Sequence, residues 1–121
     1  MTLSPQVCDF EAVRTHLETL ALGDCSMEVC LSVEEAFVNI VFYSHCTSIG
    51  YSAEVSDGVL TVVLTDDGLA FDPTAFPPHE YDDNPTAGGL GIDIIRKMMD
   101  GMVYERENDT NRLTLTKRLQ S

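Results

Sequence analysis

The chain has few basic residues: seven Lys and Arg side chains stand against 20 Asp and Glu, giving a formal net charge of −13 over 121 residues. An acidic surface of this size repels phosphate backbones, and we therefore expect no nucleic-acid partner. Binding to anionic membranes is disfavoured for the same reason. An anionic ligand would have to be held by a metal ion, by backbone N–H groups and by a few well-placed donors.

Other features that are absent narrow the class of protein. No stretch approaches the roughly 18 apolar residues of a membrane span. The start, Met1–Pro5, lacks the basic segment and apolar core of a signal peptide. There is no C-x-x-C pair, so a zinc site or a disulfide framework is disfavoured. We therefore expect a cytoplasmic protein whose four cysteines are small buried hydrophobes: Cys8, Cys25, Cys30 and Cys46.

What remains is ordinary for one folded domain. Hydrophobic residues make up 44% of the chain and charged residues 22%, which is too apolar for disorder. The sequence has no internal repeat and no low-complexity segment. We expect a single domain over residues 1–121.

The first half of the chain has the spacing of two helices. Asp9 can cap a first helix that Gly23 would end, with an apolar stripe at Phe10, Val13, Leu17 and Leu20. A second helix is predicted from Asp24 to His45. Its expected inward-facing residues are Met27, Leu31, Phe37, Ile40 and Val41.

The second half favours strands. Ile49–Val55 and Val59–Thr65 read as a hairpin around Ser56-Asp57-Gly58. An irregular segment, Asp66–Gly89, precedes a helix at Leu90–Met99. Two strands, Met102–Glu107 and Arg112–Leu119, then flank a polar turn at Asn108–Asn111. This order predicts an α+β two-layer α/β sandwich, with helices on one face of a mixed, mostly antiparallel sheet.

The first motif that carries chemistry lies on the second helix. Glu35 and Asn39 are four residues apart and so share one helix face. A carboxylate there can accept a hydroxyl proton, and a carboxamide oxygen can bind Mg²⁺. Taken alone, the pair is better explained by a solvated Glu and an Asn that happens to lie one turn later.

The second motif, Asp66-Asp67-Gly68, directly follows a predicted strand. A buried carboxylate at a strand end can accept a hydrogen bond from the exocyclic amine of adenine and discriminate against guanine. Gly68 would let the backbone approach the base. An ordinary type I turn explains the same letters.

The third motif, Gly88-Gly89-Leu90-Gly91-Ile92, opens the third helix. Glycines at a helix N-terminus expose N–H groups that can hold phosphate. The motif is neither a Walker A loop nor a Rossmann fingerprint, because no Gly-Lys-Ser/Thr follows and no strand precedes it. A flexible hinge is the alternative.

In this order the three motifs resemble the N, G1 and G2 boxes of the Bergerat (GHKL) ATP-binding fold. Two further segments are similar to the stand-alone anti-sigma-factor serine kinases of that fold. One is the ending, in which Asp100-Gly101-Met102-Val103-Tyr104 leads to Asn111-Arg112-Leu113-Thr114-Leu115. The other is Phe71-Asp72-Pro73. The resemblance extends from about Phe10 to Leu119.

The resemblance implies a role for each matching residue. Glu35 would be the general base, Asn39 the Mg²⁺ ligand and Asp66 the residue that reads adenine. Pro73–Ala87 would be the ATP lid. The further nucleotide-binding positions would be Gly68, Ala70, Thr86, Gly88, Gly89, Leu90, Gly91 and Ile92.

The implied function is an ATP-dependent anti-sigma factor that phosphorylates a serine of a STAS-domain antagonist. Such proteins bind a sigma factor as homodimers. The alternative is a nucleotide-dependent binding module with little or no catalysis, because the segment Pro73–Ala87 contains no Lys or Arg. A histidine-kinase fragment and an acidic interaction protein without ligand rank below both.

Overall fold

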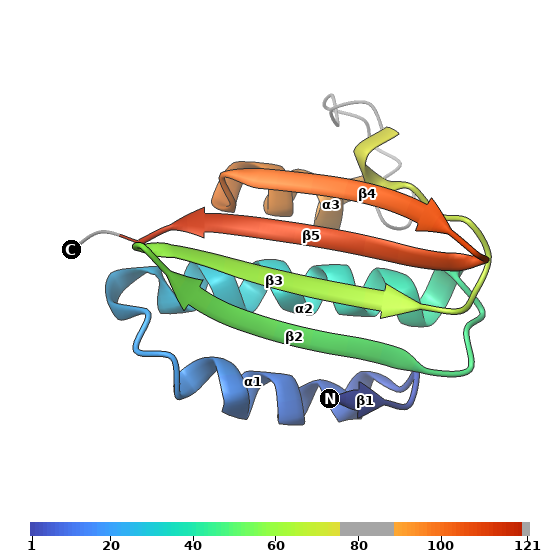
Figure 1. Cartoon of the computed structure of the whole chain (residues 1–121), viewed down its shortest axis with the longest axis horizontal. Helices are drawn as coiled ribbons and strands as arrows, with labels where there is room; N and C mark the ends of the chain where they lie inside the picture. The colour runs from blue at the N-terminus through green and yellow to red at the C-terminus, as the bar shows by residue number, and fades with distance from the viewer. Residues whose placement is uncertain (76–88, 120–121) are drawn as a thin grey trace.

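The structure is a computed structural model that describes residues 1–75 and 89–119. The described part of the chain forms three α-helices and a sheet of antiparallel strands (Figure 1). In chain order, with η for a 3₁₀ helix, the elements are β1 (Thr2–Leu3), η1 (Val7–Asp9), α1 (Phe10–Glu18), η2 (Gly23–Cys25), α2 (Ser26–Tyr43), β2 (Ile49–Ser56), β3 (Val59–Asp66), η3 (Pro73–Ala75), α3 (Gly89–Met98), β4 (Gly101–Glu107) and β5 (Thr110–Arg118).

The strands form one sheet in the order β1-β2-β3-β5-β4. Every strand pair in the described part of the chain is antiparallel, so the expected α+β sandwich is confirmed but the sheet is not mixed. The β2–β3 hairpin turns on Asp57 and Gly58, whose φ angles are 53° and 76°. Two positive φ angles in a two-residue loop match the twist of the strands they connect.

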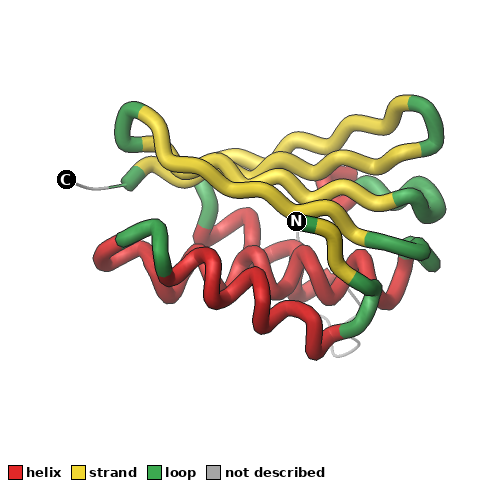
Figure 2. The backbone as a smooth tube through the Cα atoms, turned by 60° about the horizontal axis from the view of Figure 1, so that its bottom comes forward, coloured by secondary structure: helices red, strands yellow, loops and turns green. Residues whose placement is uncertain are grey.

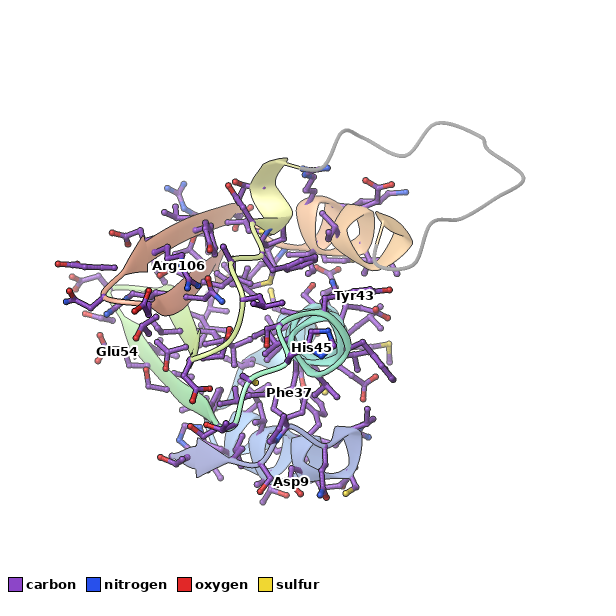
Figure 3. All side chains as sticks on the ribbon, turned by 90° about the vertical axis from the view of Figure 1, so that its right-hand side faces the viewer. Asp9, Phe37, Tyr43, His45, Glu54 and Arg106 are labelled. Carbon is purple, nitrogen blue, oxygen red and sulfur yellow. The ribbon has the colours of Figure 1, made fainter. Side chains whose placement is uncertain are left out.

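The helices lie in a second layer against one face of the sheet (Figure 2). Helix α2 lies between the other two helices, with α1 on one side of it and α3 on the other (Figure 3). Phe10 of α1 and Phe37 of α2 are fully buried, with ring centroids 5.7 Å apart. Alternate residues of β3 complete the core, because successive strand side chains point to opposite faces: Leu60, Val62 and Leu64.

The ends of the first helix differ from expectation. The helix ends at Glu18 and not at Gly23, because Ala21 and Gly23 both adopt positive φ, at 53° and 63°. Asp9 does occupy the N-cap position, but its carboxylate accepts a hydrogen bond from the Ser4 N–H, at 3.0 Å, and makes no cap bond.

The expected inward face of the second helix is partly wrong. Phe37 and Ile40 are buried, and Val41 packs partly against the core, but Met27 is 81% exposed and Leu31 36% exposed. The buried face runs instead through Val29, Val33, Ala36, Phe37 and Ile40. Apolar residues on both sides of a helix make its inward face ambiguous from the sequence.

Two smaller expectations also change. Cys8 is exposed and the other cysteines are only partly buried, so they are not four core residues. The short strand β1 was not expected; it pairs with the start of β2. No helix in the described ranges has the length and apolarity needed to cross a membrane.

Candidate nucleotide site

Asp66 ends strand β3 with its side chain on the helix side of the sheet, only 5% exposed. Its Oδ1 accepts hydrogen bonds from the Gly68 N–H, at 2.9 Å, and from Asn111 Nδ2, at 3.0 Å. Among the described residues, nothing donates to Oδ2. A buried carboxylate therefore has one oxygen fixed by the protein and one oxygen left to accept a donor from a ligand.

Asn111 is the centre of the network that holds Asp66. It lies directly opposite Asp66 in the β3–β5 register and is 4% exposed. Its Nδ2 also donates to the Leu69 carbonyl, at 2.7 Å. Its Oδ1 accepts from the Tyr104 hydroxyl and from Arg106 Nη1, the latter at 2.9 Å. The amide of Asn111 is thus saturated and oriented, which in turn orients the carboxylate.

Arg106 closes this network from the rim. Besides Asn111, its Nη1 donates to the Gly68 carbonyl at 3.0 Å. Figure 3 shows the arginine over the sheet at this end of the molecule. One guanidinium therefore ties strand β4 to the backbone turn that follows Asp66.

Close packing against α2 explains why residue 68 is a glycine. A Cβ at this position would lie 2.7 Å from the carbonyl carbon of Ser44, at the C-terminus of α2. The next residue, Leu69, donates its N–H to the Ser44 carbonyl at 2.6 Å. The turn therefore packs on α2 so closely that only glycine fits.

Asn39 and Glu35 extend the site along α2. Asn39 lines the same pocket as Asp66, is 5% exposed, and its Nδ2 has no hydrogen-bond partner in the described part of the chain. A buried polar group normally has a partner, so an orphaned amide that faces a pocket fits a polar ligand. Glu35 lies one turn earlier and is partly exposed. Both residues lie in α2, so their spacing of four places them on one helix face, but Glu35 is not among the described residues that line the pocket.

The pocket lies between the end of the sheet and the two helices α2 and α3. Its polar lining is Asn39, Ser44, Asp66, Tyr104 and Asn111, and its apolar lining is Ala36, Ile40, Phe71, Pro73, Ile95 and Leu113. The enclosed volume is about 20 Å³, which is room for about one water. A ligand the size of a nucleobase would therefore require lining side chains to move.

Phe71 is one of the side chains that would have to move. Its ring stacks on that of Tyr43, with centroids 5.5 Å apart and planes 10° from parallel. Tyr43 lies near the C-terminus of α2 on the side of α3 (Figure 3). The stack joins the helix to the segment that follows the Asp66 turn.

Helix α3 begins at Gly89, so the predicted glycine motif does open a helix of ten residues. The backbones of Gly89, Leu90 and Gly91 form its first turn, where N–H groups have no partner within the helix. Ile92 is fully buried, so any contact of this residue with a ligand would come from its backbone. Of the other predicted nucleotide-binding positions, Ala70 is exposed beside the Asp66 turn. Thr86 and Gly88 lie outside the described residues, as does most of the expected lid.

Arg96 of α3 contacts the segment that follows the Asp66 turn. Its Nη2 donates to the carbonyls of Pro73 and Thr74, at 3.3 and 3.2 Å. Its Nη1 lies 3.6 Å from the Asp93 carboxylate. The guanidinium thus connects α3 to η3, while Lys97 next to it is exposed.

Sequence reasoning missed Asn111, Tyr104 and Arg106 as site residues. Asn111 was expected in a turn, but strand β5 already begins at Thr110. The signal was present: Asn111, Leu113 and Leu115 alternate, so the asparagine belongs to the buried face of its strand. A polar residue on that face needs a buried partner, and Asp66 is that partner.

Comparison with known proteins identifies the family of the chain. Residues 8–117 match the family described as the histidine kinase-like ATPase domain. The serine/threonine-protein kinase BtrW of Bordetella bronchiseptica is 32% identical over an alignment of 114 residues, which covers 83% of this chain and 79% of BtrW.

Solved structures show the same fold at lower identity. The histidine kinase domain of the blue-light activated kinase from Erythrobacter litoralis EL346 superposes with a TM-score of 0.59 at 18% identity, over 78% of this chain and 45% of that one. The histidine kinase AdeS of Acinetobacter baumannii gives 0.57 at 20% identity, over 79% and 48%. This chain thus spans less than half of either histidine-kinase chain. Because the fold, the buried aspartate and the match over residues 8–117 agree, the chain belongs to the family of histidine kinase-like ATPase domains, which implies that it binds ATP.

Proposed function

We propose that this chain is a protein-serine kinase that uses ATP with Mg²⁺. The observation that carries the proposal is the buried, half-satisfied carboxylate of Asp66, which shares a pocket with the orphaned amide of Asn39. The similarity to a serine/threonine-protein kinase supports the choice of a protein hydroxyl as the acceptor.

Asp66 and the backbone around it would bind the nucleotide. Its free Oδ2 accepts a hydrogen bond from the exocyclic amine of adenine, whereas the oxo group of guanine would place two acceptors against each other. Phosphates would lie at the start of α3, where the N–H groups of the first turn and the helix dipole favour anions. The residues proposed there are Thr86, Gly88, Gly89, Leu90, Gly91 and Ile92, with Gly68 and Ala70 beside the base.

Asn39 and Glu35 would serve the transfer step. Mg²⁺, when bound, offsets the negative charge of the phosphates, and the Oδ1 of Asn39 is an oxygen ligand suited to it. The described residues contain no cluster of three or more His, Cys, Asp or Glu that could hold a metal ion by itself.

Glu35 would accept the proton of the substrate serine. As its proton leaves, the serine oxygen forms a bond to the γ-phosphorus. The bond from that phosphorus to the β–γ bridging oxygen breaks, so that ADP is the leaving group.

The partners we propose are a STAS-domain antagonist as the phosphate acceptor and a sigma factor as the sequestered protein. The anti-sigma-factor kinases that the sequence resembles combine these two partners with a homodimeric state and a cytoplasmic location. We propose the same assembly and location here.

A second candidate function has an observation in its favour. No Lys or Arg lines the described pocket, and Arg96 is engaged by Pro73 and Thr74. Phosphoryl transfer depends heavily on positive groups that offset charge in the transition state. A nucleotide-dependent binding module with slow or no turnover would also have this site.

A phosphorylation assay separates the two functions. The protein is incubated with radiolabelled ATP, Mg²⁺ and a candidate STAS-domain protein of the same organism, alongside Glu35→Gln and the control Glu54→Gln, whose side chain is exposed on β2. A kinase labels the STAS protein on serine, Glu35→Gln slows labelling at least about 100-fold, and Glu54→Gln leaves it nearly unchanged. No labelling, with partner affinity that still differs between ATP and ADP, would instead establish the binding module.

A further inference from the structure

One side of α2 carries a row of apolar side chains that begins with Met27 and Leu31, the two residues that were expected inside and lie outside. Met27 is 81% exposed, Leu31 36% and Phe42 60%, and the partly buried Val38 lies between them. Spacings of four, seven and four residues place all four on one side of the helix. Contiguous exposed apolar surface of this kind on a soluble protein marks an interaction site.

A groove runs beside the start of this row, between α1 and α2. Its volume is about 610 Å³, within the range of sites that bind ligands or side chains. Leu17 is buried within it, and Met27, Cys30 and Leu31 line it from α2. The groove is separate from the Asp66 pocket, with which it shares no lining residue.

The rim of the groove is acidic. Glu18, Asp24 and Glu34 line it, and α2 itself, from Ser26 to Tyr43, contains no Lys or Arg. Arg14 is the one cation among the described lining residues.

That cation is already engaged. Arg14 Nη2 lies 3.0 Å from the Glu34 carboxylate, and its Nε lies 3.6 Å from Glu11. Its guanidinium also lies over the ring of Phe10, 5.7 Å from the centroid. The groove therefore presents negative charge around an apolar floor.

These observations decide between two occupants. A second copy of the chain that docked groove against groove would bring two acidic rims together, so like charges would meet at this contact. A segment with apolar side chains along one side and Lys or Arg beside them would pack on the apolar floor and pair with the acidic residues of the rim.

We propose that the α1–α2 groove and the apolar row of α2 dock a basic amphipathic segment of a partner protein. This deepens the partner-binding half of the proposed function and does not depend on the kinase half. The apolar side chains of the segment lie over Met27 and Leu31, and its basic residues meet Glu18 and Asp24, because Glu34 is already paired with Arg14.

The test uses a defined probe, a 14-residue helical peptide of leucine and lysine with leucine on one face, and a leucine–glutamate peptide as its counterpart. Each is titrated into the isotope-labelled full chain and followed by NMR at low and moderate salt. The variants are Met27→Lys and Leu31→Lys in the groove. Val103→Lys is the matched control. Val103 is also exposed, at 55%, but it lies on strand β4 and is not one of the groove residues, and the change in charge is the same.

We expect the leucine–lysine peptide to shift amide signals within residues 14–34 and the leucine–glutamate peptide to leave them unchanged. Met27→Lys should raise the dissociation constant at least about tenfold, as loss of a central apolar contact does, and Val103→Lys no more than about threefold. Absence of binding, or equal weakening by Met27→Lys and Val103→Lys, overturns the proposal.

Two further measurements identify the alternatives. Sedimentation that shows a wild-type dimer, separated into monomers by Met27→Lys, assigns the groove to a second copy and overturns the proposal. ATP titration of the same variants should match wild type. Failure of wild type to bind ATP would overturn the proposed function and leave the groove to be decided by the peptide.

Discussion

Replacing Asn111 by aspartate tests whether this residue positions Asp66. The Nδ2 that now donates to Asp66 Oδ1 at 3.0 Å and to the Leu69 carbonyl at 2.7 Å becomes an oxygen. Two ionised carboxylates about 3 Å apart repel by ~5 kcal/mol at an effective dielectric constant of ~20. Arg106, which already donates to Asn111 at 2.9 Å, offsets part of that repulsion.

The cost of Asn111→Asp should depend on pH in a defined direction. One proton shared between the two carboxyls restores the hydrogen bond, so the pKa of the pair in the folded variant lies above that of an unfolded carboxyl. The stability due to that proton is present at low pH and is lost as the pH rises through the raised pKa. Relative to wild type, the variant should be little destabilised near pH 4.5 and most destabilised near pH 8.

Urea unfolding of wild type and variants from pH 4.5 to 8 measures this difference. Asn111→Leu should lose about 1.5–3 kcal/mol, the worth of a hydrogen bond to a charged group. Asn108→Asp, in the exposed β4–β5 turn, is the control for a new carboxylate and should stay within about 0.5 kcal/mol of wild type. An Asn111→Asp variant as stable as wild type at pH 8 would refute the positioning role.

Two further changes have outcomes that the contacts determine. Gly68→Ala would press a methyl group against the Ser44 backbone, so urea unfolding should show a loss of about 1–3 kcal/mol, and an unchanged midpoint would contradict that packing. Burial raises the pKa of Tyr51 to about 12 from 10.0, so stability associated with its neutral hydroxyl is present below pH 10 and is lost as the pH rises toward 12. Tyr51→Phe should remove that alkaline loss and, because the 2.8 Å contact with His16 disappears, cost about 1 kcal/mol at pH 8; an unchanged alkaline slope in unfolding titrations would refute it.

The parts of the fold that local chemistry dictates were predictable. Asp57 and Gly58 can both adopt positive φ, so the hairpin and its register followed from the letters. The alternating residues of β3 indicated a strand with one buried face. The place of Asp66 at the end of that strand followed directly.

The parts that depend on tertiary packing were not predictable. Met27 and Leu31 are as apolar as the residues that face the sheet, and only the positions of α1 and the sheet decide which side of α2 is buried. The need for glycine at position 68 comes from the Ser44 backbone, 24 residues earlier. The pairing of Asn111 with Asp66 requires the β3–β5 register, which joins residues 45 apart.

We propose above that Asp66 reads adenine in the pocket beside Asn39. Isothermal titration of ATP and GTP, each with Mg²⁺, into wild type, Asp66→Asn and Asp67→Asn tests it most directly. Asp67 is the matched control, because it is exposed and its carboxylate bonds to Thr47 and Ser48. We predict that ATP binds wild type and Asp67→Asn with the same affinity, and that Asp66→Asn loses ATP binding. GTP should bind wild type at least about 100-fold more weakly than ATP does. Equal ATP affinity in Asp66→Asn and wild type, or no ATP binding by wild type, would contradict this role of Asp66.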